Sequence, residues 1–240
     1  MSDLSQVTAV ILAGGQGTRL REVVTDRPKA MAEINGQPFV YYLLDQLAEE
    51  NVDRVIISTG YMAKEIKETV GSSYKGLVID CSSEEKPLGT GGALKLVGQV
   101  IGTKYCLVMN GDSFTEFDCV SILMNHIKSN ASITMVVKLV EDSSRYGTIH
   151  MNEQNKIIQF IEKGGIAGQG LINTGVYLMN TLVLQEISDK IPCSLEYDFF
   201  PSMIGKGICG NETEGKFIDI GTPKSYAKAA AFFEQPSVQT

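Results

Sequence analysis

The chain has 240 residues, of which 43% are hydrophobic and 20% are charged, a composition typical of one globular domain with a sizeable core. A formal net charge of −7 argues against a general nucleic-acid-binding surface, and no run approaches the roughly 20 apolar residues of a membrane span. The five cysteines are scattered without a CxxC pair, and the N-terminus lacks a secretory signal, which excludes a disulfide framework and a cysteine zinc site. We therefore expect a soluble, cytoplasmic enzyme or binding module that meets anions through a local basic cluster.

The first half of the chain alternates short apolar runs with segments of helical spacing. The runs are rich in β-branched residues and cover 7–13, 54–59, 77–81 and 105–109, and the helical segments cover 39–47, 62–70 and 93–100. Strands that alternate with helices in this way form doubly wound parallel sheets. The pattern therefore predicts an α/β fold of Rossmann-like type.

After about residue 130 the rhythm changes, and strand-like runs follow one another with few helices between them. These runs cover 133–140, 147–151, 157–161, 171–179 and 217–220, and a closing helix is expected from Pro223 to Phe233. The change predicts a mixed, partly antiparallel half that completes a pocket over the strand ends of the first half. No linker or repeat interrupts the chain, so we expect one domain over 1–240, with halves at 1–130 and 131–234 and a frayed tail at 235–240.

A glycine-rich loop follows the first strand directly, as the sequence LAGGQGTRL from Leu12 to Leu20. Glycines let the backbone approach a ligand closely, and N–H groups in a tight loop form a concave anion site, so phosphate is the expected ligand and a packing turn the alternative. No GxxxxGK[ST] occurs, and Leu20 stands where the third Rossmann glycine would be, which excludes both of those motifs. From Arg19 to Lys29 there are four basic residues against two acidic ones, a local surplus beside a strand's carboxyl end.

The sequence LAGGQGTRL followed by RPKAM resembles the signature of sugar-1-phosphate nucleotidyltransferases, written loosely as LAGGxGTRL and then PK. Further similar segments follow in order at 84–94, 110–112, 144–148, 160–164, 171–177 and 217–223. The resemblance implies a nucleotide-diphospho-sugar transferase fold (GT-A-like) with a mixed, mostly parallel sheet. It also implies a reaction that joins a sugar 1-phosphate to a nucleoside triphosphate and releases pyrophosphate, with the nucleotide bound by the first half and the sugar phosphate by the second.

The same resemblance implies roles for the loop and for two carboxylates. Arg19 would stabilise the leaving pyrophosphate, and Lys29 would bridge charge at the reacting phosphates. Asp112 and Asp219, both at strand ends, match the metal ligands, and Mg²⁺ prefers such hard oxygen donors. The triphosphate would be held by Leu12, Ala13, Gly14, Gly15, Gly17 and Thr18.

For the sugar phosphate, the family pattern points to residues that could pair with hydroxyls, meet the phosphate or leave room for a ring. These residues are Gly147, Glu162, Lys163, Asn173 and Thr174. Each of them taken singly could instead be a turn, cap or surface residue. The two histidines fit no motif, and we expect His126 on the surface of a helix.

The segment 84–94 resembles the base-reading loop of the family, with Glu84, Pro87, Gly89 and Thr90. Relatives that use UTP or dTTP commonly carry a glutamine three residues before the proline, where this chain has Glu84. An ionised carboxylate only accepts hydrogen bonds, which suits the N1–H and N2–H donors of guanine. We therefore expect GTP as the nucleotide, with a solvated acidic turn as the alternative.

Together the segments look most like guanylyltransferases that convert D-glycero-α-D-manno-heptose 1-phosphate to GDP-heptose for bacterial surface polysaccharide. A mannose-1-phosphate guanylyltransferase and a catalytically silent regulatory subunit on the same fold stay open as alternatives. The resemblance implies Mg²⁺ as cofactor, and GTP and a sugar 1-phosphate as partners. We expect no nucleic-acid or membrane partner, and a homo-oligomer is left open.

Overall fold

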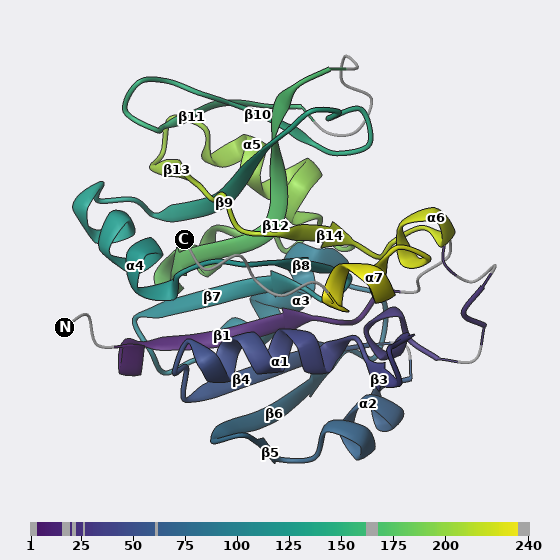
Figure 1. Cartoon of the computed structure of the whole chain (residues 1–240). Coiled ribbons are helices and arrows are strands. Elements are labelled where there is room, and N and C mark those ends of the chain that lie inside the picture. The colour runs from purple at the N-terminus through teal and green to yellow at the C-terminus, as the bar shows by residue number, and fades with distance from the viewer. Residues whose placement is uncertain are drawn as a thin grey trace.

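The computed structural model describes residues 4–15, 20, 23–25, 27–60, 62–161 and 168–234. The strands of its main sheet are β1 (Val7–Leu12), β4 (Arg54–Thr59), β5 (Ser73–Tyr74), β6 (Leu77–Ser83), β7 (Tyr105–Asn110), β9 (Ile133–Val140), β10 (Thr148–Met151), β11 (Ile157–Ile161), β12 (Gly170–Asn180) and β13 (Ile208–Glu212). They run in the order β11-β10-β12-β7-β1-β4-β6-β5, with β9 paired to β12 and to β13 (Figure 1). The sheet therefore continues from one half of the chain into the other.

Helices flank this sheet, and two small two-stranded sheets lie beside it. The helices are α1 (Val40–Glu49), α2 (Ala63–Val70), α3 (Gly89–Gly98), α4 (Cys119–Lys128), α5 (Phe200–Met203), α6 (Pro223–Tyr226) and α7 (Ala229–Glu234). The small sheets pair β2 (Glu33–Ile34) with β3 (Gln37–Pro38), and β8 (Ser113–Thr115) with β14 (Phe217–Asp219). Shorter turns of helix are η1 (Leu4–Gln6), η3 (Lys29–Met31), η4 (Thr181–Glu186) and η5 (Leu195–Phe199).

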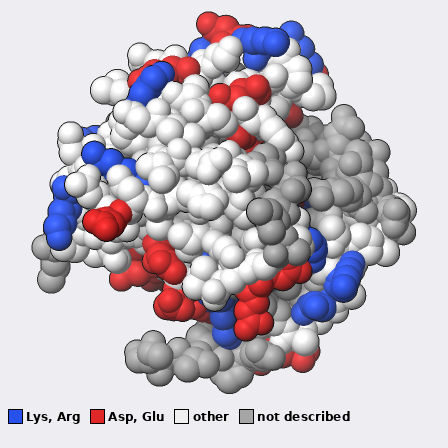
Figure 2. Space-filling view, turned by 90° about the horizontal axis from the view of Figure 1, so that it is seen from above, with Lys and Arg blue, Asp and Glu red and all other residues white. Residues whose placement is uncertain are grey.

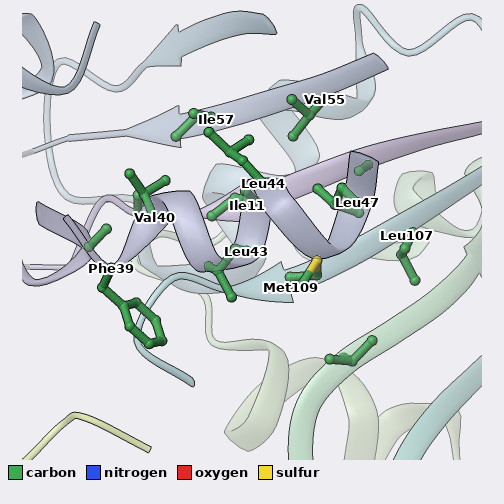
Figure 3. Close-up of a cluster of buried hydrophobic side chains, with 14 of the residues drawn as sticks. Ile11, Phe39, Val40, Leu43, Leu44, Leu47, Val55, Ile57, Leu107 and Met109 are labelled. Carbon is green, nitrogen blue, oxygen red and sulfur yellow. The ribbon is translucent and has the colours of Figure 1, made fainter. Parts of the chain in front are cut away.

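The predicted parallel half is present, because β1 pairs in parallel with both β4 and β7. Side chains of a strand alternate between the two faces of a sheet, so β1 sends Ile11 into one hydrophobic cluster and Val10 into another. On the first face α1 buries Val40, Leu43 and Leu47, which recur at helical spacing, against the strands (Figure 3). The opposite face is covered by α3. Because helices cover both faces of the parallel half, a ligand can approach it only at the ends of the strands.

The second half is mixed, as its run of strand-like segments predicts. The long strand β12 pairs antiparallel with β7, β9 and β10, and β13 adds to β9 in parallel. Beyond it, the sequence prediction of one closing helix is wrong in detail. A capping box at Thr222 starts α6, and the chain then breaks before α7. Phe233 of α7 stacks on Tyr42 of α1 with ring centroids 3.8 Å apart, so aromatic packing sets the direction of that last helix.

His126 is buried, at 2% exposure, so the prediction that it lies on the surface of its helix is wrong. Its Nδ1 lies 2.8 Å from the hydroxyl oxygen of Thr134, and its ring packs edge-on against Tyr105. Burial lowers the pKa of His126 below its ordinary value of 6.5. The sequence prediction was wrong because the face of α4 that meets β7 and β9 accepts a polar ring whose nitrogens find hydrogen-bond partners there.

Charge is dispersed on the face seen in Figure 2. Lysine and arginine side chains of the described residues stand there singly or in small groups among acidic ones. This face therefore offers an anion no broad basic surface. Among the described residues, no helix combines the length and the apolar character needed to cross a membrane.

Candidate functional site

A pocket of about 590 Å³ opens where β1, β4 and β7 end, between the two halves of the chain. The carboxyl ends of parallel strands are the usual ligand-binding edge of α/β sheets. The sequence-predicted site residues that line the pocket are Leu12, Ala13, Gly14, Gly15, Lys29, Glu84, Pro87, Gly89, Thr90, Asp112, Gly147, Asn173, Thr174 and Asp219. The other predicted residues lie outside the described part of the chain, and they are Gly17, Thr18, Arg19, Glu162 and Lys163.

The start of the glycine loop is fixed by hydrogen bonds to neighbouring strands. The N–H of Ala13 donates to the carbonyl of Ser58 on β4, at 2.8 Å, and the N–H of Gly111 donates to the carbonyl of Leu12 at 3.0 Å. A Cβ on Gly111 would lie 2.7 Å from that Leu12 oxygen, so only glycine lets the segment after β7 pack so closely on the loop. By contrast, none of the described residues places an atom within 4 Å of the Cβ position of Gly15, which lines the pocket.

One ammonium and two carboxylates lie together at one end of the pocket. Nζ of Lys29 donates to Oδ2 of Asp112 at 2.8 Å, and the Lys29 side chain is only 14% exposed. Asp219 is brought beside this pair because β14 pairs with β8, which places Asp219 opposite Ser113. A Cβ on Gly221 would lie 2.6 Å from Oδ1 of Asp219 and 3.4 Å from Nζ of Lys29. Residues far apart in sequence thus form one cluster.

This cluster can hold a divalent cation. Two carboxylates with open room beside them suit Mg²⁺, which uses one or two carboxylates together with water and substrate phosphates. Asn110 also lines the pocket, and its buried Oδ1 has no hydrogen-bond partner within the described residues. Groups of three or more His, Cys, Asp or Glu side chains that could hold a metal do not occur among the described residues. The donor set therefore fits an ion whose coordination a phosphate ligand completes.

The Glu84 carboxylate stands at another end of the pocket, where β6 ends. Its Oε2 accepts a hydrogen bond from the N–H of Leu88 at 3.0 Å, and its Oε1 lies against Gly14 and Gly60. Burial raises the pKa of this carboxyl above its ordinary value of 4.5, an effect that the Leu88 N–H opposes in part. Within the described residues Glu84 forms no ion pair. It is an acceptor suited to N–H donors of a ligand.

The loop after Glu84 and the start of α3 are joined to a distant segment. The N–H of Cys193 donates to the carbonyl of Leu88 at 2.8 Å, and the N–H of Gly91 donates to the carbonyl of Cys193 at 2.9 Å. Gly89 has φ +77°, and a Cβ there would overlap the Cys193 carbonyl, so glycine is required at this close approach. These contacts place Glu196 in the pocket wall beside Thr90.

The remaining wall comes from β12 and from the segment before β10. The Asn173 amide donates to the hydroxyl of Tyr177 at 2.8 Å and accepts from the N–H of Gly175 at 2.9 Å. The Thr174 hydroxyl donates to the carbonyl of Val136 and the residue is buried, so its hydroxyl belongs to the core although the residue lines the pocket. Gly147 lines the same wall, and because glycine has no side chain, the pocket keeps room there for a bulky ligand.

Several pocket residues received no role from the sequence. They are Ala30, Ser58, Ala93, Asn110, Gly111, Ser113, Tyr146, Gly175, Glu196, Tyr197 and Phe217. Asn110 and Tyr146 lie inside motifs that carry the family resemblance, so their motif neighbours Asp112 and Gly147 were a usable signal. Glu196 lies in the segment SLEYDFFP, which also resembles the family, but no residue of that segment received a role, and its pocket contact Thr90 is 106 residues away.

Comparisons with known proteins agree with this geometry. The family model described as nucleotidyl transferase matches residues 8–236. The chain is 38% identical over 92% of its length to a D-glycero-α-D-manno-heptose 1-phosphate guanylyltransferase of Aneurinibacillus thermoaerophilus, and 34% identical over 91% to one of Campylobacter jejuni, covering 96% of each. The crystal structure of HddC from Yersinia pseudotuberculosis complexed with GMP-PN superposes with a TM-score of 0.83 at 34% identity, over 94% of this chain and 99% of that one.

Proposed function

Because the chain belongs to the nucleotidyl transferase family, we propose that it transfers GMP from GTP to a sugar 1-phosphate and releases pyrophosphate. The proposed sugar substrate is D-glycero-α-D-manno-heptose 1-phosphate, the substrate named for the two curated relatives. The Glu84 carboxylate in the pocket wall is the main observation in favour of GTP as the nucleotide. The GMP-PN complex of the similar HddC structure supports the same nucleotide.

At the base end of the pocket, Glu84 accepts hydrogen bonds from guanine. Guanine presents N1–H and N2–H side by side, and both need acceptors. The carboxylate supplies two oxygens, and because each has more than one lone pair, the bond from Leu88 leaves acceptor capacity. Pro87, Gly89 and Thr90 form the rest of this base-binding wall.

At the phosphate end, Lys29 contacts the reacting phosphates and Asp112 and Asp219 hold Mg²⁺. Family members generally use a divalent metal ion. When bound, Mg²⁺ supplies positive charge that orients the phosphates and offsets charge developing on the leaving group. The loop from Leu12 to Thr18 cradles the triphosphate through its amides, and Arg19 stabilises the pyrophosphate as it leaves.

In the reaction, an oxygen of the sugar 1-phosphate attacks the α-phosphorus of GTP in line, and the bond to pyrophosphate breaks. No covalent enzyme intermediate is required, so catalysis consists of positioning and charge stabilisation. Lys29 is held for this by Asp112, and because the Lys29 side chain is mostly buried its charge acts over a short distance in a sheltered site. Residues 1–130 thus hold the nucleotide, and residues 131–234 hold the sugar phosphate.

On the sugar wall, the proposed contacts are made by Gly147, Glu162, Lys163, Asn173 and Thr174. Thr174 contributes through atoms other than its hydroxyl, which is bonded in the core. All five cysteines are free thiols, which supports a reducing compartment, the cytoplasm, as the place of the reaction.

The test is a panel of nucleotides against sugar phosphates. Purified protein with Mg²⁺ is mixed with GTP, UTP, dTTP or ATP and with heptose, mannose or glucose 1-phosphate, and pyrophosphate release is followed. The highest kcat/KM is expected for GTP with the heptose phosphate. A preference for mannose 1-phosphate would replace the sugar assignment, and preference for another nucleotide would remove GTP. Absence of release with every pair would indicate a silent regulatory subunit.

A further inference from the structure

The Glu196 carboxylate lines the pocket, and the proposed function gives it no role. It lies on η5, the single π-helical turn Leu195–Phe199. Its Oε2 accepts hydrogen bonds from the hydroxyls of Thr90 and Ser194, both at 2.9 Å. Its Oε1 has no hydrogen-bond partner within the described part of the chain, and it is not among the buried atoms there that lack one. One oxygen is therefore fixed by protein, and the other remains available at the pocket wall.

The hydrogen bonds hold this carboxylate in one orientation before any ligand arrives. The Thr90 hydroxyl donates its proton to Glu196 and accepts the N–H of Leu195 at 2.8 Å. Ser194 in turn accepts the N–H groups of Glu196 and Tyr197. A side chain whose geometry is already set loses little conformational entropy when a ligand binds it.

Glu196 is hydrogen-bonded to Thr90 of the base-binding wall, and its segment packs toward the proposed sugar wall. Phe200, which directly follows η5, packs its ring 4.7 Å from that of Tyr177 on β12. The Tyr177 hydroxyl accepts from Asn173, a residue of the proposed sugar wall. Phe200 also contacts Phe160 on β11, with ring centroids 6.2 Å apart. The segment that carries Glu196 is therefore packed against β12, the strand that carries Asn173 of the sugar wall, and against β11.

We propose that Oε1 of Glu196 accepts a hydrogen bond from a hydroxyl of the sugar 1-phosphate and contributes to the choice of sugar. The inference rests on the proposed function. A carboxylate attracts hydroxyl donors and repels a phosphate, so its partner is the polyol part of the sugar and not the phosphate. Thr90 acts through Glu196 as a positioning residue, because its hydroxyl is engaged with that carboxylate.

The experiment compares Glu196→Gln with the wild type by steady-state kinetics, varying each substrate while the other is saturating. Removing a charged hydrogen bond should lower kcat/KM for the sugar phosphate about 10- to 100-fold, while KM for GTP changes less than about threefold. Glu153→Gln, which neutralises an exposed carboxylate on a turn, is the matched control. Repeating the comparison with sugar phosphates that lack single hydroxyls should identify one analogue on which Glu196→Gln has no further effect, since the contact is already missing.

The possible outcomes separate this inference from the proposed function. Wild type without pyrophosphate release would overturn both. Normal wild-type activity with an unchanged sugar KM in Glu196→Gln would overturn this inference alone, as would a rise confined to the GTP KM or a lost kcat that added Mg²⁺ restores. If Glu196→Gln does not fold, Thr90→Val should raise the sugar KM and Thr90→Ser should bring it back toward the wild-type value. Equal values for those two variants would count against the proposal.

Discussion

The two ends of the pocket use carboxylates in opposite ways. At the phosphate end, Asp112 has the Lys29 ammonium at 2.8 Å, with Asp219 close by. At the base end, Glu84 accepts a neutral backbone N–H and its burial raises its pKa. In the first arrangement the ammonium offsets part of the carboxylate charge, which suits a site proposed to bind a metal ion and phosphates. In the second arrangement, no cation of the described residues pairs with the carboxylate, so donors from a ligand can stabilise its charge. In the proposed function, the same functional group thus serves catalysis at one end and selectivity at the other.

The largest expected effect comes from removing a charge at the phosphate end. Asp219→Asn and Asp112→Asn keep the side-chain shape but weaken metal binding, so kcat should fall by orders of magnitude with every nucleotide and recover partly as Mg²⁺ is raised. The measurement is kcat against Mg²⁺ concentration, with Asp53→Asn, an exposed carboxylate, as control. Near-normal turnover of Asp219→Asn at low Mg²⁺ would remove its metal role.

At the base end, Glu84→Gln should change which nucleotide is used more than how fast the chemistry runs. The amide replaces one acceptor by a donor that faces a guanine N–H. Losing a charge-assisted hydrogen bond of about 1.5–3 kcal/mol lowers kcat/KM for GTP about 10- to 100-fold. Use of UTP and dTTP should change far less or rise. A variant that keeps its preference for GTP would show that Glu84 does not read the base.

A smaller effect is expected from Gly60→Ala, because Gly60 is not a pocket-lining residue and acts on the base end through Glu84. A Cβ at Gly60 would overlap Oε1 of Glu84 and lie 3.0 Å from the carbonyl oxygen of Gly14, so the carboxylate must shift. The kcat/KM for GTP should fall roughly 3- to 10-fold, with little change in kcat. Gly102→Ala is the control, since no atom of the described residues lies within 4 Å of its Cβ position. Equal kinetics for the two variants would mean that the position of Glu84 is not critical.

The smallest effect is a pH dependence that belongs to the base end alone. Glu84 must be ionised to accept both guanine donors, and its pKa is raised above 4.5. The preference for GTP over UTP should therefore decline as pH falls, beginning above pH 4.5, by about twofold when pH equals the raised pKa and half of the carboxyls are protonated. Taking the ratio of the two nucleotides cancels titration of their shared triphosphate. The decline should be absent in Glu84→Gln, and its persistence there would assign it to another group.

The local patterns of the chain predicted much of this molecule. The run from Val7 to Ala13 is rich in β-branched residues and ends at glycines, so it could be recognised as a buried strand that leads to a glycine loop at the sheet edge. Lys29, Glu84, Asp112 and Asp219 were found because each lies within a short motif. A site whose residues follow directly after strands is readable in this way, since strand order alone places those residues at one edge.

Other features were decided only by tertiary structure, because their causes lie between segments distant in sequence. His126 is buried because Thr134 and Tyr105, on neighbouring strands, pack against its ring, and the sequence of its own helix does not show this. The direction of α7 follows from Phe233 packing on Tyr42, which no helix-period pattern encodes. Glu196 enters the pocket through hydrogen bonds and backbone contacts to residues about a hundred positions earlier. The sequence by itself thus determined the strands, the position of the glycine loop and most of the polar groups that line the pocket. Long-range packing decided which buried polar groups find partners and which acceptor is left to face a ligand, because both depend on neighbours that only the folded chain brings together.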